Sequence, residues 1–351
     1  MKNSDWKRVI ILLTCLMGTA LLLILVFGLI EDSSNKTDTY IDDNNRVDAS
    51  SGNHNEIGDN LSDYDDEDKI IYYNSAAYTL KDDIETILII GIDQLIESDG
   101  SRKESHQSDF LALVIMDNKA RSFQVLHLNR DTMADIPMMD IAGMEYGTFY
   151  GQLALAHAYG NNDKSRCRNT VKAVKNLLYG IEIDHYISLT MDAVAILNDS
   201  VGGVTVQLLD DFSHIDPTYT KDELVTLTGE HALTYVRERM NLDDSSNLNR
   251  MKRQRQYIGA LFETYIESKK NDSEDSIKTL LKINDYLVSD CTISRLSDLI
   301  DKLGEYLYER ILSIDGEVKY GDEFVEYYLD ESSAQRTIIE LFYEELDPNR
   351  Q

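Results

Sequence analysis

The sequence has little positive charge. Its 351 residues include 34 Lys and Arg against 63 Asp and Glu, a formal net charge of −29. Nucleic acid is therefore not expected as a partner, because the phosphate backbone attracts basic surfaces. Any anionic ligand must instead be held by a local cluster of arginines. The length allows one large domain or two modest ones with an ample core.

The sequence also lacks the common catalytic and metal-binding signatures. It contains no GxSxG elbow, no HExxH pair and no Walker-type glycine loop. The three cysteines fit no metal or redox spacing, and a disulfide between Cys167 and Cys291 is permitted outside the cell but not required. The seven histidines are scattered, and we expect His127 and His157 to be packed or hydrogen-bonded rather than ligands.

One long hydrophobic run is present near the amino terminus. Residues Val9 to Ile30 form 22 uncharged residues, which span about 33 Å as a helix, enough for the hydrocarbon core of a bilayer. Lys2, Lys7 and Arg8 precede this run, so it predicts an uncleaved single-pass anchor with a cytoplasmic amino terminus. A cleaved signal peptide is the alternative, but the run is too long and no small-x-small cleavage site follows it.

The segment after the anchor is acidic and polar. Residues 31 to 70 contain 13 acidic and 3 basic residues. Such a segment cannot bury enough apolar surface to offset its ordering entropy. We therefore expect an anchor at 1–30, a disordered stalk at 31–75 and an extracellular folded domain at 76–351.

The folded part alternates between strand and helix patterns, which predicts an α/β fold, a three-layer α–β–α sandwich with a mixed central sheet. We expect strands at 86–93, 110–116, 121–128, 185–191 and 205–209, a polar loop at 94–108, and helices at 168–179, 191–197, 249–269, 296–312 and 334–345. The part after residue 271 is expected to be a helical scaffold with little chemistry.

Charged residues stand at the ends of three predicted strands. Asp93 ends the first, Asp109 precedes the second, and Arg130 and Asp131 follow the third. An antiparallel strand beside a parallel pair would bring all of them to one edge of the sheet, where open α/β folds bind ligands. A surface turn with a salt bridge is the alternative interpretation of Arg130 and Asp131.

Two further arginine groups follow. Arg237 and Arg239 are about 200° apart on a helix, so both can serve one site only if the helix ends near Tyr235. On the helix at 249–269, a second face holds Arg250, Arg253, Gln254 and Tyr257, and such a basic face is usually solvated. Arginine clusters bind phosphates, and carboxylates beside them make sense if a divalent cation mediates, as in pyrophosphate chemistry.

The segments together resemble the LytR–CpsA–Psr (LCP) family, in that family's order. The matching motifs are GID at 91–93, SD at 108–109, NRDT at 129–132, AHAYG at 156–160, VGGV at 201–204, TGEHALTYVRER at 228–239 and RMKRQRQ at 250–256. The resemblance implies an α–β–α sandwich with an apolar tunnel for a polyprenyl chain. It implies transfer of a glycopolymer from a polyprenyl-pyrophosphate carrier to peptidoglycan, with pyrophosphatase activity as a further possibility.

The resemblance also implies roles for individual residues. The catalytic residues would be Arg130, Asp93 and Asp109, with Mg²⁺ held by the two carboxylates. Pyrophosphate would be bound by Arg130, Arg237, Arg239, Arg250 and Gln254. Partners would be the lipid-linked glycopolymer, peptidoglycan and the membrane. The general base stays open between Asp93 and a neighbouring carboxylate.

Four positions depart from the family pattern. Gln107 stands where the family usually has Arg, Asn129 replaces a Pro, Asn161 replaces a Gly, and the loop between Asp93 and Asp109 is longer. One lost Arg contact to phosphate costs about 1.5–3 kcal/mol. Gln107 and Asn161 therefore keep open a non-catalytic lipid-carrier-binding or regulatory protein as an alternative to a transferase. A structural cell-wall spacer is a third interpretation, which only the acidic stalk supports.

Overall fold

The computed structural model describes residues 70–96, 102–140, 142–270, 276–321 and 324–346. The apolar run Val9 to Ile30 and the acidic segment up to residue 69 lie outside the described residues, so the anchor and the stalk stay predictions. No helix within the described ranges is long and apolar enough to cross a membrane. The first strand, β1 (Ile71–Tyr73), lies inside the range that we expected for the stalk.

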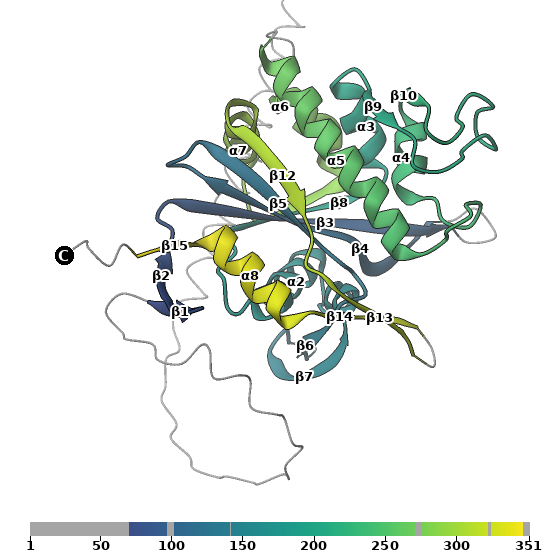
Figure 1. Cartoon of the computed structure of the whole chain (residues 1–351). Helices are drawn as coiled ribbons and strands as arrows, with labels where there is room; N and C mark the ends of the chain where they lie inside the picture. Colours follow the sequence, from purple (N-terminus) through teal and green to yellow (C-terminus); the bar gives the residue numbers. More distant parts are fainter. Residues whose placement is uncertain (1–69, 97–101, 141, 271–275, 322–323, 347–351) are drawn as a thin grey trace, which may run out of the picture. The chain divides into compact units, whose positions relative to one another are not determined.

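A six-stranded mixed sheet forms the centre of the fold (Figure 1). From edge to edge the order is β11 (Leu287–Ser289), β8 (His185–Thr190), β3 (Ile84–Ile96), β4 (Arg102–Asp117), β5 (Ser122–Leu128) and β12 (Leu307–Leu312). The strand β4 is antiparallel to both of its neighbours, β3 and β5. The pairs β3 with β8 and β5 with β12 are parallel.

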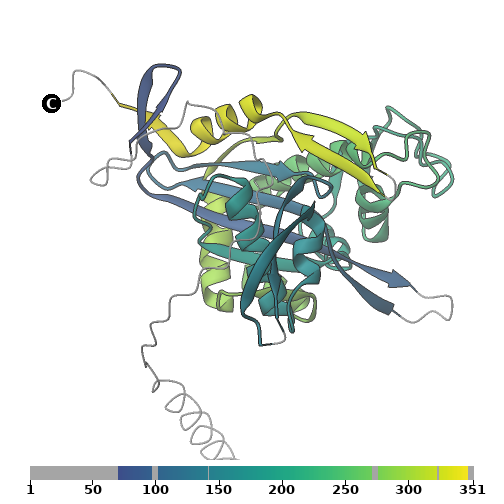
Figure 2. The ribbon, with the colours of Figure 1, turned by 90° about the horizontal axis from the view of Figure 1, so that it is seen from below.

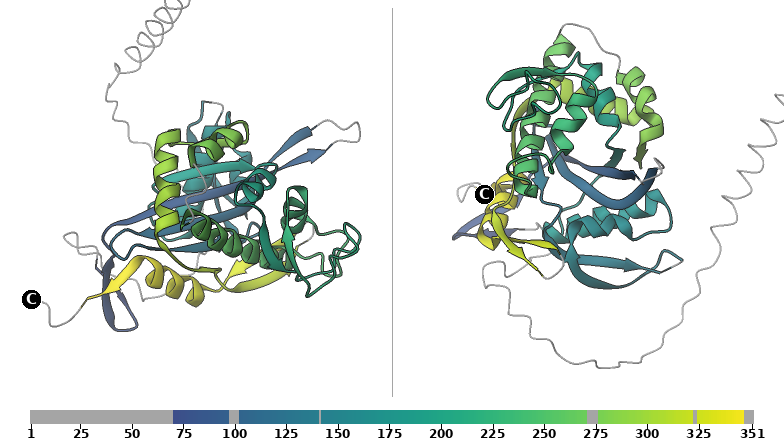
Figure 3. Two further views of the ribbon diagram at one scale, coloured as in Figure 1. Left: turned by 90° about the horizontal axis from the view of Figure 1, so that it is seen from above. Right: turned by 90° about the vertical axis from the view of Figure 1, so that its right-hand side faces the viewer.

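The central strands are apolar on both faces because helices cover both faces of the sheet. Leu88 and Ile90 of β3 belong to the core under α2 and α8, and Ile87 and Ile89 belong to the core under α5 and α7. The near-continuous apolar runs of the sequence follow from this double burial. Figure 3 shows the sheet between its two helical layers.

The helices and 3-10 turns have the following bounds. They are η1 (Leu153–Ala158), α2 (Asp163–Leu177), α3 (Ala193–Ser200), α4 (Glu230–Arg237), α5 (Asn247–Lys270), α6 (Ser276–Ile283), η2 (Asn284–Tyr286), α7 (Ile293–Glu305) and α8 (Glu331–Phe342). Asn162 begins α2 with a capping box that it forms with Ser165, and Gly180, at φ +85°, follows its end as the sequence predicts.

Smaller sheets surround the central one. Three strands pair in the order β1, β2 (Ala76–Leu80) and β15 (Tyr343–Glu345), and the remaining pairs are β9 (Val204–Gln207) with β10 (Leu224–Leu227), β6 (Met133–Met139) with β7 (Glu145–Gln152), and β13 (Gly316–Tyr320) with β14 (Val325–Leu329). Figure 2 shows α8 and the β13–β14 hairpin following one another along one margin of the sheet.

Several predicted elements are wrong. The loop expected at 94–108 is largely strand, because β3 continues to Ile96 and β4 begins at Arg102, and the two form an arm that projects beyond the sheet (Figures 2 and 3). The helix expected at 296–312 ends at Glu305 and gives way to β12, and the part after residue 276 contains five strands. Cys167 and Cys291 are both free thiols, so they form no bridge.

Candidate functional site

The predicted meeting of strand ends at one sheet edge is confirmed. Because β3 and β5 run the same way and β4 runs between them in the opposite direction, the end of β3, the first part of β4 and the end of β5 share one edge. Arg130, two residues past β5, forms an ion pair through Nη1 with Oδ1 of Asp109 on β4. The turn after β5 is therefore tied to the neighbouring strand by a charged contact.

Arg130 is held by three acceptors. Besides Asp109, its Nη2 donates a hydrogen bond of 2.9 Å to Oε1 of Gln107, and its Nε lies 3.5 Å from Oδ1 of Asp131. Its side chain is 16% exposed, and Nε has no hydrogen-bond partner. The guanidinium is therefore held by acceptors on three neighbouring residues.

The loop around Arg130 is fixed by amide side chains. Oδ1 of Asn129 accepts from the backbone N–H of Asp131 (3.0 Å) and from Nδ2 of Asn247 (2.9 Å). The carboxylate of Asp131 accepts from Asn247 (2.8 Å) and from Gln152 (3.1 Å). Burial raises the pKa of Asp131, while Arg130 and Arg250 oppose that rise. Asp131 therefore supports the position of Arg130.

Arg250 brings a second guanidinium to the same carboxylate from α5. Its Nη1 lies 3.7 Å from Oδ1 of Asp109, and its Nη2 donates to Oδ1 of Asn247 at 2.8 Å. The residue is 4% exposed, and burial lowers its pKa to about 10, with Asp109 opposing the shift. The interpretation of this helix face as solvated is wrong, because the face packs into the protein.

Arg237 and Arg239 are separated by the end of α4, as the sequence requires. The helix ends at Arg237, and Glu238 is extended at φ −57° and ψ 140°. Nε of Arg237 donates to Oδ2 of Asp93 at 2.8 Å. The exposed side chain of Arg239 makes no hydrogen bond or ion pair with any described residue, and its charge acts on both Asp131 and Arg250. Arg239 is therefore available to a ligand.

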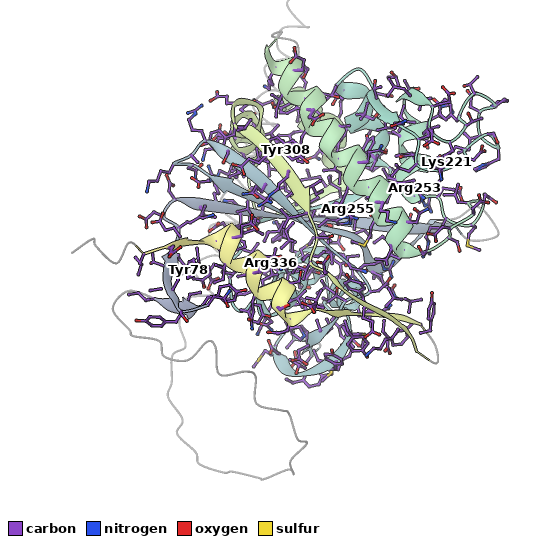
Figure 4. All side chains as sticks on the ribbon, in the orientation of Figure 1. Tyr78, Lys221, Arg253, Arg255, Tyr308 and Arg336 are labelled. Atoms are coloured by element: carbon purple, nitrogen blue, oxygen red, sulfur yellow. The ribbon has the colours of Figure 1, made fainter. Side chains whose placement is uncertain are left out.

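Arg253 and Gln254, neighbours on α5, have different surroundings. Arg253 is 0% exposed and is used inside the protein, where it donates to the carbonyl of Tyr235 (3.0 Å) and to Oδ2 of Asp210 (2.5 Å). It extends from the opposite side of α5 to Arg255 (Figure 4). Gln254 donates to the carbonyl of Val236 (3.1 Å), and its buried Oε1 has no partner.

An apolar cavity of about 280 Å³ lies between the sheet and the helices α3, α5, α6 and α7. Gln254 lines it one helical turn from Arg250, and Gly91 lines it two residues before Asp93, so the cavity reaches the charged cluster. A Cβ at Gly91 would lie 2.8 Å from Cβ of Phe110, so only glycine fits here. Other lining residues are Ile87, Ile89, Ala112, Val114, Val125, Ile187, Tyr257, Ile258, Leu261, Phe262 and Leu299.

Asp93 and Asp109 fit a divalent cation by their chemistry. Mg²⁺ prefers oxygen ligands and is commonly held by one or two carboxylates together with phosphate oxygens and water. Oδ2 of Asp109 takes no hydrogen bond from any described residue, because both arginine contacts go to Oδ1. In the described part of the chain, the one close group of three metal-ligand side chains is elsewhere, at His185, Asp290 and Cys291.

Three contacts of the site were not predicted from the sequence. Gln107 contacts Arg130, and Asn247 and Gln152 contact Asp131. Asn247 is the first residue of α5 and joins Asn129, Asp131 and Arg250. Its position three residues before Arg250 on the same helix was the available signal. Gln152 has no such signal, because it reaches Asp131 from the end of β7.

Fold and site define a class of α/β protein in which an arginine–carboxylate cluster stands at the end of an apolar cavity beneath a mixed sheet. The chain belongs to the LytR_cpsA_psr family, which its residues 27–341 match. The resemblance seen in the motifs is thereby confirmed.

Known proteins are similar to part of this chain in sequence and in fold. The Halalkalibacterium halodurans polyisoprenyl-teichoic acid–peptidoglycan teichoic acid transferase TagU is 33% identical over 178 residues, which are 50% of this chain and 51% of that protein. The chain thus spans about half the length of such curated relatives. The crystal structure of Bacillus subtilis TagV is 25% identical, with a TM-score of 0.53 over 74% of this chain and 98% of that one. A structure described as TagT bound to LI-WTA shares the fold at 22% identity, with a TM-score of 0.56 over 74% and 90%.

Proposed function

We propose that this protein is a membrane-anchored transferase that moves a glycopolymer from a polyprenyl-pyrophosphate carrier to peptidoglycan. The observation that carries the proposal is that the lining of the apolar cavity includes Gly91, two residues before Asp93, and Gln254, four residues after Arg250, which pairs with Asp109. A ligand that suits both parts has a long apolar chain and a compact, highly charged head. A polyprenyl pyrophosphate is such a ligand.

The cavity favours a lipid because its walls carry almost only apolar side chains from both the sheet and the helices. Transfer of a hydrocarbon chain from water into such walls is favourable by about 0.8 kcal/mol for each buried CH₂ group. The name of the Halalkalibacterium halodurans relative, a polyisoprenyl-teichoic acid–peptidoglycan teichoic acid transferase, supports the same class of ligand.

The cluster favours pyrophosphate because several guanidinium groups lie close together at one place, although the chain as a whole is acidic. We propose that Arg130, Arg237, Arg239 and Arg250 bind the phosphate oxygens, with the second amide N–H of Gln254 as an additional donor. Asp93 and Asp109 would hold Mg²⁺, which would neutralise charge on the phosphates. Arginine is suited to this role because its planar fork binds phosphate bidentately.

In the proposed reaction, a hydroxyl oxygen of peptidoglycan attacks the phosphorus that carries the glycopolymer. The bond from this phosphorus to the bridging oxygen breaks, polyprenyl monophosphate leaves, and a phosphodiester forms between the two polymers. Asp93 takes the hydroxyl proton, since its side chain is 22% exposed and that of Asp109 is 11% exposed. Arg130 and Arg250 stabilise the charge that develops on the bridging oxygen.

Blocking the cavity tests the lipid part of this proposal. Ala112 of β4 is buried and lines the cavity, so Ala112→Trp should fill the space that a polyprenyl chain needs. We expect affinity for a polyprenyl pyrophosphate to fall by about 1–3 kcal/mol, while inorganic pyrophosphate still binds. The matched control is Ala120→Trp in the exposed turn after β4. Unchanged lipid affinity in Ala112→Trp would contradict the assignment of the cavity.

The alternative function is a non-catalytic protein that binds the lipid carrier. The observation that favours it is Gln107, which accepts a hydrogen bond from Arg130 where the family pattern has a further cation. Peptidoglycan-dependent release of polyprenyl phosphate separates the two functions, because a binding protein shows the affinity without the release.

A further inference from the structure

Exposed tyrosines form a row that begins at the candidate site. On β7, Tyr146 is 65% exposed and Tyr150 is 58% exposed, and exposed Thr148 lies between them. Alternate residues of a strand share a face, so Thr148, Tyr150 and Gln152 point to the same side of β7. Tyr146 lies next to them at the bulge of the hairpin, where Gly147 pairs with Met138 and Glu145 pairs with Met139. We call this row, Tyr146, Thr148, Tyr150 and Gln152, the tyrosine row.

The row is continuous with the phosphate-binding cluster. Gln152 donates to Oδ1 of Asp131 at 3.1 Å, and Asp131 lies 3.5 Å from Nε of Arg130. Gln152 also donates to the carbonyl of Val325 at 2.8 Å, so the β13–β14 hairpin stands beside the row at this end. A polymer that lies along β7 would therefore lead directly to Arg130.

The surroundings of the row are acidic. Asp135 is paired with Tyr150 across the β6–β7 hairpin, and both Asp135 and Glu326 act on the Tyr150 hydroxyl. Among the described residues, neither carboxylate has a cation within 4.0 Å, whereas Glu145 and Glu317 are paired with Lys172 and Lys319. Tyr328 donates to Glu326 at 2.8 Å, and Nζ of Lys319 lies over the Tyr328 ring, 4.6 Å from its centre.

This combination selects a neutral, hydroxyl-rich ligand. A sugar ring has an apolar C–H face, which packs on an aromatic ring, and hydroxyl groups, which donate to ionised carboxylates. A polyanion such as a phosphate-linked glycopolymer is disfavoured, because Asp135 and Glu326 would repel it. An anionic membrane surface is disfavoured for the same reason.

We propose that the tyrosine row binds the glycan strand of the acceptor and presents its hydroxyl to the cluster at Arg130. This inference rests on the proposed transfer reaction, and it assigns the acceptor side of that reaction. Tyr146 and Tyr150 are four residues apart, about 14 Å along a strand. One sugar ring cannot contact both side chains, so binding should require an oligosaccharide.

The test is titration calorimetry of the full-length chain with a neutral hexamer of N-acetylglucosamine. Tyr146→Ala and Tyr150→Ala should each weaken binding by about threefold to tenfold, since an aromatic contact contributes about 0.5–1.5 kcal/mol. Tyr150→Phe should keep most of the affinity. The matched control is Tyr72→Ala on β1, whose side chain is 55% exposed and belongs to another sheet.

Two outcomes would overturn the inference. One is wild-type affinity for the hexamer in the Tyr146→Ala/Tyr150→Ala double variant, and the other is tighter binding of poly(glycerol phosphate) than of the hexamer. Affinity for polyprenyl pyrophosphate is measured separately on the same variants and should not change. Failure of the wild-type chain to bind that lipid would refute the proposed function, whereas the hexamer titration alone decides on the row.

Discussion

Gln107 accepts a hydrogen bond of 2.9 Å from Nη2 of Arg130, and so occupies a donor of the guanidinium that also pairs with Asp109. A cation at position 107 would lose this bond and repel Arg130 when no ligand is bound. With pyrophosphate present, the same cation would gain a phosphate contact. Compared with the family pattern, this site therefore has one positive charge fewer, and its Arg130 side chain is held by an additional hydrogen bond.

Gln107→Arg should accordingly shift stability and affinity in opposite directions. We expect unfolding free energy without ligand to fall by about 1 kcal/mol, because a neutral acceptor is lost beside a partly buried guanidinium. Pyrophosphate affinity should rise about tenfold through the new charge-assisted contact. Thermal unfolding and calorimetry measure the two effects. Gln107→Met, which removes the acceptor without adding a charge, is the control, and a fall in affinity in Gln107→Arg would contradict the explanation.

Arg250 and Arg253 should respond to substitution in different ways. Arg253→Met leaves the carboxylate of Asp210 and the carbonyl of Tyr235 without their buried donor, so it should destabilise the protein by about 3–5 kcal/mol. Arg250→Met removes a buried cation whose pKa is lowered and whose Nε has no partner, so stability should be kept or raised. Denaturant unfolding measures both changes. Equal losses of stability would show that Arg250 is as structural as Arg253.

The same pair separates binding from folding. Arg250→Met should reduce affinity for pyrophosphate by about tenfold or more, because a charge-assisted contact is lost. The comparison uses folded protein, with circular dichroism as the check. Wild-type affinity in Arg250→Met would remove this residue from the proposed site.

His127 predicts a pH dependence of stability. Its side chain is 1% exposed, and burial lowers its pKa from 6.5 to about 3, with Arg255 and Arg250 adding to the shift. The unfolded chain therefore binds the proton first, so this contribution to stability is complete above pH 6.5 and is lost as the pH falls toward 3. The slope in that window is up to about 1.4 kcal/mol per pH unit.

His127→Leu should flatten that slope. Urea unfolding at several pH values between 4 and 7 measures the free energy of unfolding of both proteins. The wild type should lose up to about 1.4 kcal/mol per pH unit as the pH falls, and His127→Leu should lose less. His214→Leu, at an exposed position, is the control for loss of a surface imidazole. An unaltered pH dependence in His127→Leu would contradict the assignment of acid sensitivity to this residue.

The strands of the sheet could be predicted because their residues are buried on both faces, as Leu88 and Ile87 show on β3. β12 could not, since Leu307–Leu312 is a largely exposed edge strand whose charged residues continue the helical pattern of α7. The β3–β4 arm was missed for a related reason. Backbone pairing extends it beyond the core, and such pairing leaves no hydrophobic pattern in the sequence.

The site could be predicted where charged residues follow the buried run of a strand, as Asp93 does within β3 and Arg130 does after β5. Two arginines of α5, three residues apart, show the limit of this approach. Arg250 and Arg253 are both arginines on one helix, and only packing reveals that Arg253 pairs with Asp210, which is 43 positions away. The amides around Arg130 were missed because hydrogen bonding between distant loops has no periodic signal.

The most direct test of the central claim is the release of polyprenyl monophosphate from a polyprenyl-pyrophosphate-linked glycopolymer, followed by phosphorus NMR with Mg²⁺ and peptidoglycan present. The full-length chain should release it only when peptidoglycan is added, with the glycopolymer recovered on the peptidoglycan. Arg130→Ala should slow this release by about a hundredfold or more, because a preorganised donor to the developing charge is lost. Release by Arg130→Ala at the wild-type rate would contradict the account.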